Sequence, residues 1–94
     1  MMLPVLKNEL IIHHHLGLGD HFDMNGMVRH YLDTYDKVHV FSKDSYFNMV
    51  EYMYRDTASI MVHRLEFPDD EYKSVEAFRE RSGIENFLRI GFEH

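Results

Sequence analysis

The sequence predicts an α/β fold: a three-layer, Rossmann-like half domain whose four-stranded parallel sheet has the order 3-2-1-4 and carries three helices. Two observations predict this fold. Short apolar runs alternate along the chain with stretches in which apolar residues recur every three or four positions. A turn with two glycines, residues 16–20, joins the first apolar run to the first helical stretch. Such alternation favours parallel strands joined by right-handed crossovers.

Four segments have the composition of strands, namely residues 9–15, 38–41, 58–63 and 87–91. Residues 10–12 form a continuous apolar run, which is typical of a strand buried on both faces. Successive side chains of a strand alternate between the two faces of the sheet. We therefore expect His13 and His15 to face one side and His14 the other.

Three stretches have helical periodicity. The first is predicted to begin near Phe22, and its inward stripe consists of Met24, Met27, Val28, Tyr31, Leu32 and Tyr35. Residues 43–45 offer side-chain oxygens that cap a second helix, whose stripe includes Val50 and Met53. Pro68 fits the first turn of a third helix, and residues 82–83 are expected to end it.

Length and composition limit the classes of protein that fit. The 94 residues predict one Rossmann-like domain over residues 1–94, either a fragment or a minimal form of a two-domain protein, since doubly wound domains usually continue after a fourth strand. A net charge of −6 argues against nucleic-acid binding. The absence of cysteine excludes disulfides and fits a cytoplasmic location. No apolar stretch is long enough for a membrane span.

The glycine turn is the predicted functional site. In open parallel sheets, ligands bind outside the carboxyl ends of the strands, where the strand order reverses. Gly17 and Gly19 let the chain turn tightly, and the next helix directs free N–H groups into the same space. Asp20 either caps that helix or takes part in chemistry. The predicted ligand-binding residues are Gly17, Gly19, His15, His21 and Lys43. Lys43 is alternatively a solvated surface charge.

The sequence predicts no cofactor and no metal. The dinucleotide fingerprint lacks its third glycine, which Phe22 replaces, and Ser42 and Lys43 stand where the ribose-binding acidic residue belongs. No Walker A motif occurs. Two histidines on one face of the first strand, with His39 or His63, have the donor type for zinc, but no carboxylate is placed beside them and no H-E-x-x-H motif occurs.

Residues 15–20 (His-Leu-Gly-Leu-Gly-Asp), followed by residues 25–30 and 37–41, resemble the amino-terminal segment of GT-B type glycosyltransferases, in particular the ADP-heptose:lipopolysaccharide heptosyltransferase-like group. Members of that group have two Rossmann-like domains facing a cleft, and the amino-terminal domain mainly holds the acceptor. The resemblance implies that Asp20, next to Gly19, is the catalytic base that deprotonates the acceptor hydroxyl. This chain departs from the group in lacking the second domain and the downstream motifs.

We therefore expect the acceptor-side domain of a glycosyltransferase-like protein that uses a nucleotide-sugar and is inactive alone. A sugar or a phosphorylated acceptor is the implied partner. The alternative is a non-catalytic α/β module that binds a small anionic ligand or mediates homo-oligomer assembly. A thin sheet with three helices leaves an edge or a face uncovered, which favours a homodimer.

Overall fold

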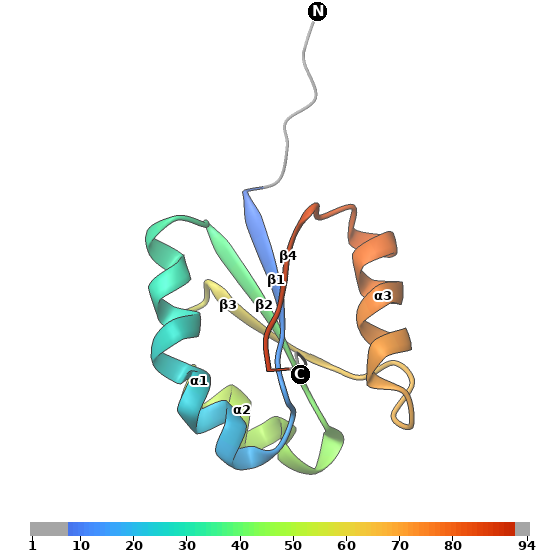
Figure 1. Ribbon diagram of the computed structural model, residues 1–94. Coiled ribbons are helices and arrows are strands. Elements are labelled where there is room, and N and C mark those ends of the chain that lie inside the picture. Colours follow the sequence, from blue (N-terminus) through green and yellow to red (C-terminus); the bar gives the residue numbers. More distant parts are fainter. Residues whose placement is uncertain (1–7, 92–94) are drawn as a thin grey trace, which may run out of the picture.

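The computed structural model describes residues 8–91 and confirms the predicted fold class (Figure 1). All strand pairs are parallel, and the strand order is β3-β2-β1-β4. The strands are β1 (Glu9–His13), β2 (Lys37–Ser42), β3 (Ile60–Arg64) and β4 (Asn86–Arg89). The helices are α1 (Leu18–His30), α2 (Phe47–Met53) and α3 (Glu71–Ser82). Helices α1 and α2 lie on one side of the sheet and α3 on the other, which gives three layers.

The face of the sheet under α1 and α2 holds the larger apolar core. Leu10 and Ile12 of β1 and Val38 and Val40 of β2 point into this layer and are buried. They pack with Val28 of α1, and each fully buried aliphatic side chain contributes about 1.5–3 kcal/mol. The alternation along β1 and β2 therefore anchors the two helices that follow the carboxyl edge of the sheet.

Within residues 8–91, α3 is the helix that covers the opposite face, which holds the smaller apolar cluster. Ile11, Phe41 and Val75 form its apolar centre. His13 and His39 are buried on the same face. His13 and His14 do face opposite sides of the sheet, as the strand alternation predicts, because His13 contacts α3 and His14 contacts α1.

Helix α1 begins earlier than predicted. Its first residue is Leu18 rather than a residue near Phe22, and Gly17 occupies the N-cap position with an extended backbone. Asp20 therefore lies inside the first turn and makes no capping hydrogen bond, so the interpretation of Asp20 as the helix cap is wrong. A carboxylate in the first turn is still favourable, because it faces the positive end of the helix dipole.

The starts of α2 and α3 also differ from the prediction. Residues Asp44–Tyr46 form a 3-10 turn, and α2 begins at Phe47 without a side-chain cap. Pro68 lies before α3 rather than in its first turn, and Asp70 is the cap, since its Oδ1 accepts a hydrogen bond from the Lys73 amide at 3.0 Å. Gly83 ends α3 with a φ of 70°, which confirms the predicted stop.

The strands are also shifted slightly from the predicted ranges. β1 ends at His13 and β4 at Arg89, because these two residues are the last partners in their shared ladder. β3 runs to Arg64, where it pairs with Ser42 of β2. The sequence also predicts that residues 91–94 end beside the glycine turn, and of these, residues 92–94 lie outside the described residues. Within residues 8–91, no helix is both long and apolar enough to cross a membrane.

The cap of α3 supplies a stability test. Replacing Asp70 with alanine removes the hydrogen bond to the Lys73 amide, so the free energy of unfolding should fall by about 1 kcal/mol. Asp69→Ala is the matched control, since Asp69 is exposed and precedes the cap. Urea denaturation of both variants measures the difference. Equal losses in the two variants would contradict the assignment of the cap.

Candidate functional site

The glycine turn lies at the carboxyl end of β1, beside the end of β4. His15 donates a hydrogen bond from Nε2 to the Gly91 carbonyl and so links the two chain segments that leave these strands. Gly91 has a φ of 87°, and a Cβ atom there would lie 2.8 Å from His15 Cδ2. Only glycine fits this position without strain. The predicted switch point between β1 and β4 is thus held together by His15 and Gly91.

The Asp20 carboxylate folds back toward the start of its own helix. A Cβ atom on Gly17 would lie 2.7 Å from Asp20 Oδ2, so the glycine leaves room for this carboxylate. The carboxylate accepts no hydrogen bond from any residue within the range 8–91. Asp20 is half-buried. The turn therefore presents an oriented carboxylate with unused acceptor capacity at the carboxyl edge of the sheet.

The free N–H groups at the start of α1 are less suited to an anion than the sequence suggests. Gly19 is exposed, and a side chain there would meet open space. A bound anion at this helix end, however, would lie close to the negative charge of Asp20 in the first turn. The geometry therefore favours a ligand that offers a hydroxyl to Asp20 over one that offers only negative charge.

Two buried imidazoles lie directly behind the turn. The rings of His14 and His21 meet edge to face with their centroids 4.8 Å apart, and both are buried. His14 Nδ1 donates to the His15 carbonyl at 2.6 Å, which leaves Nε2 of His14 as an acceptor. Neither this atom nor either ring nitrogen of His21 has a hydrogen-bond partner within the described residues. His21 is thus a buried neighbour of the turn rather than an exposed ligand contact.

Burial keeps both rings of this pair uncharged. It lowers the pKa of His14 below the usual value, and it lowers the pKa of His21 to about 4. The nearby Asp20 carboxylate acts in the opposite direction on both pKa values but does not outweigh the loss of solvent. At neutral pH, the Asp20 carboxylate therefore lies beside two neutral rings and not beside a cation from this pair.

On the other face of the sheet, His13 belongs to a structural network with α3 and β4. Arg89 donates from Nε to His13 Nδ1 at 2.9 Å, so the ring proton is on Nε2, which donates to Glu71 at 3.1 Å. Burial is the largest cause of a lowered His13 pKa. His13 thus connects the end of β1 to both neighbouring elements and offers no free nitrogen to a ligand.

A second pair of histidines links three strands on this α3 face. His39 Nε2 donates to Glu9 at 2.6 Å, and His39 Nδ1 lies 2.8 Å from His63 Nε2. The His63 ring packs against Phe78 at 4.4 Å. Burial, followed by the charges of His39 and Arg81, lowers the pKa of His63 to about 4. This pair was not predicted, because it depends on the register that sets Phe41 of β2 opposite His63 of β3.

Lys43 and the three adjacent histidines, His13 to His15, occupy separate places in the fold. Lys43 is exposed directly after β2, at the same edge as the glycine turn. Among residues 8–91, no group of three or more histidine, aspartate or glutamate side chains is arranged to hold a metal ion. The three adjacent histidines make different contacts. His13 bonds to α3, His14 packs on α1, and His15 bonds to Gly91.

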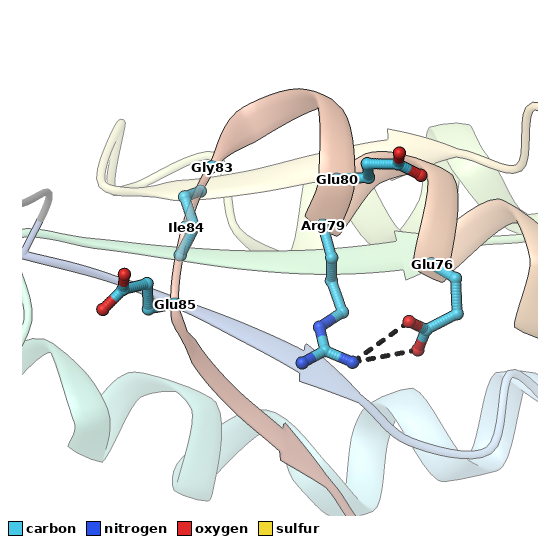
Figure 2. A pocket seen from close by; sticks show the side chains of 6 residues that line it. All are labelled: Glu76, Arg79, Glu80, Gly83, Ile84 and Glu85. Atoms are coloured by element: carbon cyan, nitrogen blue, oxygen red, sulfur yellow. Dashed lines mark hydrogen bonds and ion pairs between the residues drawn. The ribbon is translucent and has the colours of Figure 1, made fainter.

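Two hollows on the surface lie away from Asp20. One, of about 520 Å³, is at the opposite, amino edge of the sheet, between the end of α3 and the start of β4. Figure 2 shows Arg79 in this hollow paired with Glu76, with Glu80 and Glu85 nearby. The Arg79 Nη1 atom lies 3.1 Å from each carboxylate oxygen of Glu76. The other lies between α1 and α2 and is mainly apolar. The acidic hollow does not coincide with the predicted site, and the arginine that lines it, Arg79, already pairs with Glu76.

The buried histidines predict that acid destabilises the fold. A histidine whose folded pKa is lowered stabilises the fold fully above its ordinary value of 6.5, and this contribution is lost as the pH falls toward about 4. Each such histidine adds a slope of up to about 1.4 kcal/mol per pH unit. His21→Leu removes one titrating group without leaving an unpaired polar atom, so the free energy of unfolding should depend less on pH between 6.5 and 4.

Urea denaturation of the unmodified chain and the variant at a series of pH values measures these slopes. His30→Leu is the control, since His30 is an exposed residue of the same helix, and it should keep the slope of the unmodified chain. A His21→Leu slope equal to that of the His30→Leu control would contradict the assignment of a buried, neutral His21.

Comparisons with known proteins add no family to this description. No protein-family model matches the chain, and no curated protein or solved structure is similar enough to match it. The resemblance of the glycine turn to glycosyltransferases therefore stays a prediction. The basis for a proposed function is therefore the geometry at the carboxyl edge of the sheet.

Proposed function

We propose that this chain is the acceptor-side domain of a glycosyltransferase-like protein that uses a nucleotide-sugar. The observation that carries the proposal is the Asp20 carboxylate, which has no hydrogen-bond partner in the described residues and is oriented at the carboxyl end of β1. This is the edge of a parallel sheet at which ligands bind. The strand order and the Leu-Gly-Asp sequence of the turn support the same assignment.

In the proposed reaction, Asp20 acts as general base. The acceptor hydroxyl gives its proton to the carboxylate while the hydroxyl oxygen attacks the anomeric carbon of the sugar, and the nucleoside diphosphate leaves with its electron pair. A general base has to lie within hydrogen-bond reach of the proton it takes. The unused acceptor capacity of Asp20 leaves the carboxylate available for such a contact, and Gly17 provides the space that the carboxylate occupies.

The other predicted site residues take different parts in this proposal. Lys43 is exposed at the end of β2 and suits a phosphate group on the acceptor. His15 holds the switch point closed against Gly91, and His21 supports the turn from inside the core. A cytoplasmic location belongs to the same proposal and fits a chain without cysteine.

The test is an acceptor-binding assay with matched aspartate variants, because the chain is expected to be inactive alone. Phosphorylated sugars are titrated into the protein, and their dissociation constants are measured by calorimetry. Asp20→Ala removes the carboxylate that is proposed to accept a hydrogen bond from the acceptor hydroxyl, so it should weaken binding by about tenfold or more. Asp36→Ala is the control, because Asp36 is exposed at the opposite edge of the sheet and should keep the full affinity.

Two results would contradict the proposal. One is an Asp20→Ala variant that binds phosphorylated sugars as tightly as Asp36→Ala does. The other is the absence of acceptor binding by the unmodified protein across the phosphorylated sugars used.

Homo-oligomer assembly is the second candidate function. It is favoured by the apolar hollow between α1 and α2, which is lined by Phe22, Met49, Tyr52 and Met53. Exposed apolar surface of this kind usually marks a contact with another molecule. The two candidates are compatible, since the hollow and the Asp20 carboxylate use different side chains.

A further inference from the structure

Three titratable side chains form a row of hydrogen bonds across the α3 face of the sheet. His39 of β2 lies between Glu9 of β1 and His63 of β3. The Nε2 atom of His39 lies 2.6 Å from Glu9 Oε1, and its Nδ1 atom lies 2.8 Å from His63 Nε2. The proposed function uses none of these three side chains.

The carboxylate of Glu9 determines where the ring protons of this row lie. An ionised carboxylate only accepts hydrogen bonds, so His39 carries a proton on Nε2 and donates it to Glu9. In the neutral form of His39, Nδ1 is an acceptor, and the contact at 2.8 Å then requires His63 to donate from Nε2. The lone pair of a neutral His63 ring is therefore on Nδ1.

The Nδ1 atom of His63 is accessible to solvent. It makes no hydrogen bond within residues 8–91, yet it is not enclosed, in contrast to both ring nitrogens of His21. His63 is half-buried, and its ring packs on Phe78 with the centroids 4.4 Å apart. Burial lowers the pKa of His63 to about 4, so this nitrogen is unprotonated at neutral pH. The structure thus holds an imidazole in place with its lone pair available to a reactant.

Arg81 of α3 supplies positive charge near this nitrogen. It is close enough to His63 that its charge contributes to the lowered pKa of that ring. Its Nη1 atom bonds to Glu66 at 2.9 Å, in an ion pair whose two side chains are 60% and 50% exposed. Such a surface pair is weak, and a guanidinium group has five donors. Arg81 therefore keeps donors for an anionic group that approaches His63.

We propose that His63 accepts a phosphoryl group on Nδ1 from a phosphoramidate, a compound that carries its phosphoryl group on nitrogen. A bond forms between Nδ1 and phosphorus while the phosphorus–nitrogen bond of the donor breaks, and the donor amine leaves with the electron pair. Glu9, acting through His39, stabilises the positive charge that develops on the His63 ring. Arg81 contacts the transferred anionic group. One phosphorus–nitrogen bond replaces another, so the exchange needs no other reactant.

The first test compares His63 with a more exposed histidine of the same chain. The unmodified protein is incubated with potassium phosphoramidate at about pH 8, where ordinary imidazoles are neutral, and mass spectrometry locates the phosphorylated residues. Exposure alone predicts faster reaction of His30, whose side chain is 76% exposed. We expect His63 to react faster. Phosphorus NMR should place its phosphoryl group on Nδ1 rather than Nε2.

The second test removes the charge at the far end of the row. Glu9→Gln keeps an oxygen that accepts from His39 but loses the negative charge. It should slow phosphorylation of His63 by about tenfold, because a hydrogen bond to a charged acceptor is roughly twice as strong as one to a neutral acceptor. Glu71→Gln is the matched control, since Glu71 accepts from Nε2 of His13 in the same way but lies outside this row. It should keep the rate of the unmodified chain.

Any of three results overturns the proposal. His63 does not react faster than His30; or its phosphoryl group is on Nε2; or Glu9→Gln and Glu71→Gln react at the same rate. Circular dichroism shows that each variant is folded before its rate is measured. The experiment contains no sugar, so its failure would leave the proposed function untouched.

Discussion

The burial of β1 in the centre of the sheet is the constraint on which the rest of the structure depends. β1 pairs with β2 on one side and β4 on the other, and Leu10, Ile11 and Ile12 are buried on both of its faces. The strand fixes where the chain leaves the sheet and therefore where Asp20 lies. Because His13 and His14 extend the same alternation, they attach the end of β1 to α3 and α1. The glycine turn is consequently supported from both layers.

The interior of the fold contains an unusually large number of histidine side chains. His13, His14, His21 and His39 are buried, and burial lowers the pKa values of the first three. A buried neutral imidazole packs like an aromatic ring, but each ring nitrogen without a hydrogen-bond partner destabilises the fold. His14 and His21, which lie behind the turn, have such nitrogens, whereas His13 and His39 bond to carboxylates. The buried histidines therefore support the candidate site at pH values at which their rings are neutral.

The alternation of apolar runs and helical stretches predicted the parallel sheet, the half-Rossmann pattern predicted its strand order, and residues 82–83 predicted the end of α3. The first residues of the helices were harder to predict. The N-caps of α1 and α2 are Gly17 and Tyr46, and neither makes a side-chain capping hydrogen bond. The inward position of His21 was available from its spacing to Met24 and Val28. The contact between His39 and His63 could not be predicted from the sequence, since it depends on the register between β2 and β3.

The claim that the carboxyl edge binds the acceptor is tested most directly by mapping that binding on the backbone amides. Phosphorylated sugars are titrated into the isotope-labelled protein, and the amide chemical shifts are followed by NMR. The account predicts shifts concentrated at Gly17, Gly19, Asp20 and Lys43. Shifts confined to the acidic hollow at Glu76 and Glu85, or no shifts at all, would contradict it.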